Sequence, residues 1–198
     1  MAEEVQEQAK GKKKGALVAI VVLVAFLAIA GIAYSVLPSL RASAPYELTP
    51  AAEADQDLSK SLLASKVTDS GKETVTLEDL LKKSGKPLVI NMWATWCPHC
   101  TVEMNDYQKL YDEYGDRIEF VMLNVVNNPG EAIAGRDYVK EQGFTFPVYY
   151  DTDGEVRNAL TVTGIPVSAI VSADGNVVLN RPGEINYNAM KATIGKIV

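Results

Sequence analysis

The order of predicted strands and helices indicates an α/β protein built on one mixed β-sheet. Residues 88–93 are almost wholly apolar and predict a buried strand, and the segment after residue 97 has apolar side chains at three- and four-residue steps, the spacing of a helix face. Near the C-terminus, Asp174 and Gly175 separate two apolar runs and predict a two-residue hairpin. A strand–helix–strand order followed by a hairpin requires both parallel and antiparallel strand pairs. We therefore expect a central mixed sheet flanked by helices.

The N-terminus predicts a short cytoplasmic tail followed by one transmembrane helix. Residues 15–37 carry no charge and are mostly apolar, and a run of this length can cross a bilayer as a helix. Lysines are concentrated in residues 10–14, whereas only Arg41 follows the run closely. Because positive charge is retained on the cytoplasmic side, we expect residues 1–14 in the cytoplasm and the chain after residue 37 outside it.

Two other interpretations of the apolar run are a cleaved signal peptide and a buried core helix. Ala42, Ser43 and Ala44 have the pattern of a signal-peptide cleavage site. However, the run exceeds the ~7–15 residues of a signal-peptide core, and Pro45 directly after the site is an unfavourable context. We therefore predict an uncleaved, single-pass anchor in the cell membrane, with the folded domain outside the cytoplasm.

The segment after the anchor, residues 38–64, is predicted to be a linker because it is rich in Ala, Ser, Pro and acidic residues. A short helix over residues 51–63 is compatible with this interpretation. The alternative is that the segment packs on the domain. Residues 65–198 are predicted to form the domain itself.

The domain shows regularly spaced strand, turn and helix signals. The first are a strand pair over 67–75 turning at Ser70-Gly71, a helix over 77–83 capped by Thr76, the strand 88–93 and a helix ended by Gly115. A strand at 118–126, a helix at 131–142, a strand at 146–150 and a short helix at 155–160 follow. The last are strands 167–172 and 176–180 and a helix over 186–197.

Composition excludes some classes of function. The formal net charge is −6, and an acidic chain is a poor partner for nucleic acid. Two cysteines cannot form a disulfide framework, so the fold must depend on its hydrophobic core.

The chemistry is concentrated in residues 93–100, which hold both cysteines and the only histidine. Pro98 suits the first position of a helix, which places Cys97 at the helix N-terminus. Unpaired N–H groups and the helix dipole favour an anion there, and such sites lower the pKa of a cysteine. The sequence therefore predicts a reactive Cys97, with Cys100 one turn later and close enough to form a disulfide with it.

Other interpretations of the cysteine pair are a permanent structural disulfide and half of a zinc site. Zinc normally takes four protein ligands, or three and a water. Only Cys97, His99 and Cys100 are available, all within one turn and with no second cluster. We therefore predict no metal.

Several sequence motifs resemble those of the thioredoxin superfamily and, within it, of the membrane-anchored TlpA/ResA-like thiol-disulfide oxidoreductases. The motifs are residues 85–100, Glu103-Met104, residues 144–148 and Gly164-Ile165-Pro166. The resemblance covers roughly residues 65–198. It implies a thioredoxin-like fold, in which residues 127–150 match the insertion typical of the TlpA-like branch.

The resemblance also implies roles for individual residues. Cys97 attacks a disulfide, and Cys100 resolves the mixed disulfide that forms. Pro166 is expected to be a cis-proline facing the pair, and Ile165 to offer backbone groups to an extended substrate strand. Val167 stands where the family often has Thr, so contacts at that position are expected to differ.

Four further residues have candidate supporting roles. His99 is predicted to stabilise the Cys97 thiolate, or else to be a solvated residue at the helix start. In TlpA/ResA-like proteins a glutamate at the position of Glu103 influences cysteine titration; the alternative is an ordinary first-turn acid. Asn91 stands where thioredoxins carry a buried aspartate, which makes Glu103 the next candidate proton acceptor. Trp96 is expected to flank the substrate surface, whereas Trp93 is expected in the core.

The leading hypothesis is a membrane-anchored, extracytoplasmic thiol-disulfide oxidoreductase with no cofactor beyond its redox-active disulfide. TlpA/ResA-like proteins are mostly reductants, some of which reduce apocytochromes during cytochrome c maturation. The implied partners are cysteine-containing exported proteins or apocytochromes and an integral membrane thiol carrier. Pro98-His99 is, however, the dipeptide of the oxidising DsbA-like enzymes. A hypothesis of another class is a non-catalytic tethered binding domain with a structural disulfide.

Overall fold

The computed structural model describes residues 21–36, 44–70 and 72–198. It divides into two units, residues Met1–Ala44 and Pro45–Val198. The helical elements of the second unit are η1 (Ala51–Glu53), α2 (Gln56–Ala64), α3 (Leu77–Ser84), α4 (Pro98–Tyr114), α5 (Glu131–Gln142), α6 (Glu155–Ala159) and α7 (Tyr187–Ile194). Its strands are β1 (Lys66–Asp69), β2 (Thr74–Thr76), β3 (Leu88–Trp93), β4 (Glu119–Val125), β5 (Val148–Asp151), β6 (Val167–Val171) and β7 (Val177–Pro182).

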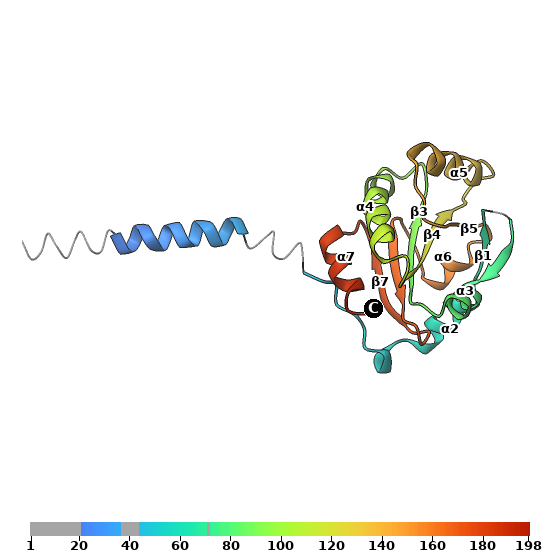
Figure 1. The fold of residues 1–198 in the computed structure, drawn as a ribbon, viewed down its shortest axis with the longest axis horizontal. Helices are drawn as coiled ribbons and strands as arrows, with labels where there is room; N and C mark the ends of the chain where they lie inside the picture. The colour runs from blue at the N-terminus through green and yellow to red at the C-terminus, as the bar shows by residue number, and fades with distance from the viewer. Residues whose placement is uncertain (1–20, 37–43, 71) are drawn as a thin grey trace, which may run out of the picture. The chain divides into compact units, whose positions relative to one another are not determined.

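The sheet has seven strands in the order β2-β1-β5-β4-β3-β6-β7. Strand β3 pairs parallel with β4, and β4 pairs parallel with β5, whereas the other pairs are antiparallel. The mixed central sheet predicted from the sequence is therefore confirmed. Figure 1 shows helices on both of its sides.

Strand β3 divides the core between the two faces of the sheet. All six of its residues are buried, and side chains alternate between faces along a strand. Val89 and Trp93 contribute to a cluster with residues of α4 and α7, whereas Leu88, Ile90 and Met92 contribute to a cluster with residues of α2, α3 and α6. Asn91 therefore shares the α4 face with Val89 and Trp93, and its polar side chain is buried there.

Helix α4 carries the cysteine motif into the core. Cys97 is its N-cap residue and Pro98 its first residue, as the sequence predicts. The buried positions recur at three- and four-residue steps: Cys100, Glu103, Met104, Tyr107, Leu110 and Tyr114. The face that begins with Cys100 is therefore the face that packs on the sheet.

The domain begins earlier than the sequence predicts, and most of the expected linker is folded. Residues from Pro45 onward belong to the compact unit. In α2, Leu62 is fully buried, and the Ser59 hydroxyl accepts a hydrogen bond from the backbone N–H of Val177 at 3.0 Å. Leu58, Leu62 and Leu63 lie on one side of α2 and pack in the core cluster that also contains Leu88, Ile90 and Met92 of β3. The predicted linker over 38–64 and the predicted domain start at 65 are therefore corrected to a start at Pro45.

This packing predicts a specific loss of stability. Leu62→Ala is expected to lower the free energy of unfolding by about 2–4 kcal/mol, because it removes buried atoms and leaves a cavity. Lys60→Ala, at an exposed position of the same helix, is the matched control. Urea unfolding of both variants measures the difference. Equal, small losses in the two variants would mean that α2 is not part of the core.

The remaining elements agree with the predicted order, with shifted ends. The C-terminal helix begins at Tyr187 rather than at Asn186, because the Asn186 side chain caps it by accepting from the N–H of Ala189. It ends at Ile194, before Gly195. Of the predicted Ser70-Gly71 turn, Gly71 lies outside the described residues.

Residues 21–36 form a helix with exposed apolar side chains along its length. No helix in the described ranges is both long enough and apolar enough to cross a membrane. The predicted span, residues 15–37, extends at both ends beyond the described part of this helix, and the predicted cytoplasmic tail lies outside it altogether.

Candidate active site

The two cysteines form a disulfide at the start of α4, with Cα atoms 5.3 Å apart. As the N-cap residue, Cys97 accepts a hydrogen bond at its Sγ atom from the backbone N–H of Cys100 at 3.2 Å. Cys97 is 5% exposed, whereas Cys100 has no exposed surface. Of the two cysteines, Cys97 is therefore the one that reaches solvent, and its sulfur lies at the N-terminus of α4.

A cis-proline lies against the disulfide. The Ile165–Pro166 peptide bond is cis, and the Ile165 carbonyl oxygen lies 3.7 Å from the Cys97 sulfur. The Pro166 carbonyl accepts a hydrogen bond from the N–H of Gly183 at 2.9 Å, which ties this turn to the end of β7. The structure thus brings together Cys97, Ile165 and Pro166, three residues that the sequence places in two distant segments.

A cavity of about 230 Å³ opens beside this contact. Its walls include Trp96 and Ile165, together with Val125, Val162 and Arg157. Trp96 is 50% exposed although it is large and apolar. An exposed aromatic ring beside a reactive disulfide is suited to contact another polypeptide.

Glu103 is buried one turn after Cys100 and is only 2% exposed. Its carboxylate accepts hydrogen bonds from the Asn91 side-chain amide at 2.7 Å and from the Ile185 N–H at 2.8 Å. Burial raises the pKa of Glu103 to about 7, although these two hydrogen bonds oppose the shift. A carboxyl group with this pKa can exchange a proton near neutral pH, which an exposed first-turn glutamate does rarely.

One turn further along α4, Tyr107 adds a second buried polar contact. The Tyr107 hydroxyl is fully buried and forms a 2.6 Å hydrogen bond with the Ser168 hydroxyl on β6. Burial raises the pKa of Tyr107 further above its usual value, and the nearby Glu103 carboxylate adds to the shift. Tyr107 therefore stays a neutral hydrogen-bonding group.

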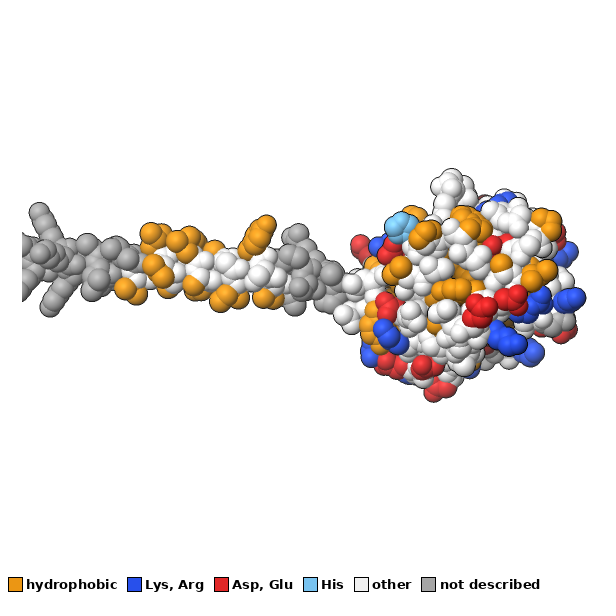
Figure 2. Space-filling view, turned by 90° about the horizontal axis from the view of Figure 1, so that it is seen from above, with side chains coloured by type: hydrophobic (Ala, Val, Ile, Leu, Met, Phe, Trp, Pro, Cys, Tyr) orange, Lys and Arg blue, Asp and Glu red, His pale blue; other side chains and the backbone are white. Residues whose placement is uncertain are grey.

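His99 faces outward, and its side chain is 74% exposed. Its Nδ1 atom contacts a carboxylate oxygen of Glu184, in the segment between β7 and α7. Figure 2 shows the only histidine of the chain at the surface, on a face that also exposes apolar side chains. The next residue, Ile185, donates to Glu103, so one short segment contacts the motif both at the surface and in the core.

Comparison with known proteins agrees with this geometry. The Redoxin family model matches residues 50–194. The chain belongs to the Redoxin family. The thiol-disulfide oxidoreductase ResA of Bacillus thuringiensis subsp. konkukian is 30% identical over 132 residues, which cover 66% of this chain and 73% of that protein.

Two further comparisons support the family. The sporulation thiol-disulfide oxidoreductase A of Bacillus subtilis is 26% identical over 121 residues, 60% of this chain and 73% of that protein. The solved structure of MTB dsbF, in mixed oxidized and reduced forms, is similar with a TM-score of 0.61 at 25% identity, covering 70% of this chain and 98% of that chain. The thioredoxin-like fold is therefore confirmed, and this Redoxin-family protein is a thiol-disulfide oxidoreductase of the ResA type.

Sequence reasoning missed several residues that complete the site. Glu184 and Ile185 gave no signal, because they lie more than eighty positions from the residues that they contact. Glu131 was expected only as the first residue of a helix, yet it is buried and accepts hydrogen bonds from Thr95, two residues before Cys97. Its position in a first helical turn is equally typical of a solvated acid, so no local pattern identifies it.

The contact between His99 and Glu184 predicts a small electrostatic effect on the redox couple. Glu184→Gln is expected to make the couple more oxidising by on the order of 10 mV, because an exposed ion pair is worth a few tenths of a kcal/mol. His99→Asn is expected to shift the potential in the opposite direction. Both shifts are expected to shrink in high salt. Equilibration with glutathione buffers measures them, and a shift unchanged by salt would contradict this explanation.

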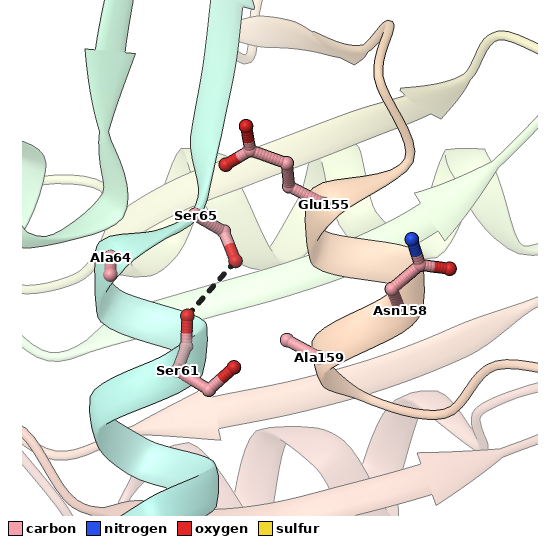
Figure 3. A pocket seen from close by; sticks show the side chains of 6 residues that line it. All are labelled: Ser61, Ala64, Ser65, Glu155, Asn158 and Ala159. Atoms are coloured by element: carbon pink, nitrogen blue, oxygen red, sulfur yellow. Dashed lines mark hydrogen bonds between the residues drawn. The ribbon is translucent and has the colours of Figure 1, made fainter.

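Another cavity of the domain, about 470 Å³, lies away from the disulfide. Figure 3 shows its lining by small side chains of α2, α6 and the residue that follows α2, including Ser61, Ser65 and Asn158. Its one acidic residue, Glu155, accepts a hydrogen bond from the Lys66 N–H. None of the residues that line it belongs to the disulfide site. Within the ranges that the structure describes, no three His, Cys, Asp or Glu side chains are grouped to hold a metal ion.

Proposed function

We propose that this Redoxin-family protein is a membrane-anchored reductant of protein disulfides outside the cytoplasm. The observation that carries the proposal is the arrangement around the pair: Cys97 reaches solvent beside the Ile165 carbonyl, whereas Cys100 is buried one turn from Glu103. The first side of this arrangement suits attack on a partner, and the second suits proton removal inside the protein.

The proposed reaction begins with the reduced dithiol. The Cys97 thiolate attacks one sulfur of a substrate disulfide, the substrate S–S bond breaks, and a mixed disulfide forms as one substrate thiolate leaves. Glu103 accepts the proton of Cys100, directly or through a water. The Cys100 thiolate then attacks the Cys97 sulfur, the Cys97–Cys100 disulfide forms, and the second substrate thiolate leaves. Two electrons thus pass from the pair to the substrate.

The substrate is proposed to bind as an extended segment across the cis-proline turn. Ile165 offers backbone groups to such a segment, and the cavity between Trp96 and Ile165 can receive a side chain that flanks the substrate cysteine. The proposed substrates are cysteine-containing exported proteins or apocytochromes. The proposed source of electrons is an integral membrane thiol carrier that reduces the disulfide again.

The charges around the motif favour a reductant over an oxidant. A strong oxidant stabilises its thiolate, because that lowers the free energy of the reduced form. Here Glu184 contacts the exposed His99 and offsets part of the attraction that a charged His99 would exert on the thiolate, and the buried Glu103 carboxylate disfavours a second anion nearby. Pro98-His99 is therefore expected to stabilise the Cys97 thiolate less than the same dipeptide would without Glu184 beside it.

The anchor is proposed from the apolar run over residues 15–37 and from the lysines before it. The exposed valine, leucine, isoleucine and phenylalanine side chains of the helix over residues 21–36 support this assignment. Residues 1–14 would then lie in the cytoplasm, and the domain from Pro45 would lie outside.

The steady-state redox state of the pair in growing cells tests the proposed direction. Acid quenching followed by alkylation with a high-mass maleimide separates reduced from oxidised protein on a gel, and the Cys97→Ser/Cys100→Ser variant gives the unlabelled position. We expect mostly reduced protein, because the electron donor of a reductant keeps its cysteine pair in the dithiol form. Mostly oxidised protein would instead support a DsbA-like thiol oxidant, and a pair that stays oxidised when substrate and carrier are supplied would support a structural disulfide in a binding domain.

A further inference from the structure

The loop between β3 and α4 is held by the carboxylate of one residue on another element, Glu131 of α5. The loop is a tight turn in which the Cys97 N–H donates to the Ala94 carbonyl at 3.2 Å. Thr95 lies inside this turn. Its backbone N–H donates to Glu131 Oε1 at 2.7 Å, and its hydroxyl donates to Glu131 Oε2 at 2.9 Å. Both carboxylate oxygens of Glu131 are therefore used on one residue of the loop.

Glu131 is itself fixed on the sheet. It is 3% exposed, and its Oε1 atom also accepts from the Asn124 side-chain amide on β4 at 2.9 Å. Asn124 and Trp93 are register partners in the parallel pair of β4 and β3, so the carboxyl ends of both strands meet here. The contact thus connects helix α5, strand β4 and the active-site loop.

Helix α5 is built to bring this carboxylate inward. Only Glu131 and Gly135 are buried within it, and they lie one turn apart on the same face. A Cβ atom on Gly135 would come within 2.9 Å of the Asn124 amide nitrogen, so the glycine allows the close approach of the helix to β4. A first-turn glutamate normally points to solvent, where it stabilises the helix dipole. Here the same position points into the protein and binds three donors.

We propose that Glu131 is a positioning residue for Cys97. It acts through Thr95: by fixing the middle of the turn, it keeps the Cys97 sulfur at the N-terminus of α4 and beside the Ile165 carbonyl. The proposal rests on the proposed function in one respect, since the sulfur so placed is taken to be the attacking one. The role depends on hydrogen-bond geometry and not on the negative charge, which by itself would disfavour a nearby thiolate.

Three variants separate geometry from charge. Glu131→Gln keeps every contact, because its amide oxygen can accept from the Thr95 N–H and from Asn124 while its NH₂ group donates to the Thr95 hydroxyl. Glu131→Ala leaves the Thr95 N–H and the Asn124 amide without acceptors. Glu141→Ala, at an exposed position of the same helix, is the matched control.

The primary readout needs no substrate. The rate of alkylation of Cys97 by iodoacetamide, followed against pH in the reduced protein, reports both the placement of the sulfur and the pH at which its thiolate forms. For Glu131→Ala we expect alkylation near neutral pH to slow by on the order of tenfold, with the curve moved to higher pH, because the helix N-terminus no longer stabilises the sulfur fully. Glu131→Gln and Glu141→Ala are expected to stay within about twofold of the wild type, a change too small to indicate displacement. Circular dichroism identifies the temperature range in which all variants are folded.

The outcomes are distinct. A Glu131→Ala protein that is folded and alkylates like the wild type would overturn the proposal. A Glu131→Gln protein that is as slow as Glu131→Ala would overturn it too, because a variant that keeps the hydrogen bonds would then behave like one that loses them. Turnover with insulin, measured on the same proteins, tests the proposed function separately. If the wild type does not reduce insulin while Glu131→Ala still changes alkylation, the proposed function fails and the positioning role stands.

Discussion

The Cys100→Ser variant is expected to accumulate a mixed disulfide between Cys97 and substrate proteins, whereas Cys97→Ser accumulates none. Cys97 reaches solvent at the helix N-terminus, and Cys100 has no exposed surface, so only Cys97 can meet a partner sulfur. Without Cys100 the mixed disulfide has no internal thiolate to resolve it. Both variants are expected to reduce insulin no faster than dithiothreitol does alone.

Non-reducing gels of cells that express each variant, followed by mass spectrometry of the adducts, measure this result. The double variant is the control for adducts that involve neither cysteine. If Cys97→Ser traps partners and Cys100→Ser does not, the two roles are exchanged, and the proposed mechanism is wrong in its first step.

The second large effect is expected from Glu103→Gln. Burial raises the pKa of Glu103 from 4.5 to about 7, so the folded protein holds this proton more tightly than the unfolded chain does. In the wild type, the contribution of this group to stability is therefore fully present below about pH 4.5 and is lost as the pH rises to about 7. The loss amounts to about 3 kcal/mol. Glu103→Gln cannot titrate and lacks this loss.

The substitution preserves much of the local hydrogen bonding. The oxygen of the new amide can accept from Ile185, and its NH₂ group can donate to Asn91 Oδ1, an acceptor that has no protein partner in the wild type. We therefore expect the free energy of unfolding of Glu103→Gln, relative to the wild type, to increase by about 3 kcal/mol between about pH 4.5 and pH 8. Urea unfolding of the oxidised proteins at both values measures this change. Glu141→Gln, at an exposed position, is the control, and parallel pH profiles for Glu103→Gln and the wild type would contradict the assignment.

Glu103→Gln is also expected to slow turnover by on the order of 10²-fold near neutral pH, because the buried proton acceptor for Cys100 is lost. Single-turnover reduction of insulin separates the two steps. The mixed disulfide with Cys97 is expected to form at the normal rate and to resolve slowly. Slow formation with normal resolution would assign Glu103 to Cys97 instead.

Local patterns were sufficient for much of the fold and for the reactive pair. The proline after Cys97, the three- and four-residue steps after it and the apolar run before it are all short-range signals, and each describes one element. The family resemblance added the cis-proline turn, which no spacing in this chain indicates. The burial of Glu103 could be expected from the same helical steps, because residues 100, 103 and 107 share one face.

The remaining features depend on tertiary contacts. The backbone N–H that stabilises the Glu103 carboxylate belongs to Ile185, and the carboxylate that holds Thr95 comes from Glu131. The two partners of each contact are far apart in the sequence, so no local pattern predicts either contact. The packing of α2 on the core is a similar case. Its leucines are spaced as on one side of a helix, but the surrounding Ala- and Pro-rich composition favours a linker. The surface that α2 covers is formed by strands distant in the sequence.

One measurement tests the central claim most directly: whether the Cys97–Cys100 pair passes its two electrons to a protein disulfide. Fully reduced protein is mixed with an equimolar amount of insulin without other reductant, quenched in acid and alkylated, and the thiols of both proteins are counted by mass spectrometry. We expect two thiols to disappear from the pair for every two that appear in insulin, with the new disulfide mapped to Cys97 and Cys100. Insulin that stays oxidised while the pair stays reduced, or equal reduction by Cys97→Ser, would contradict the claim.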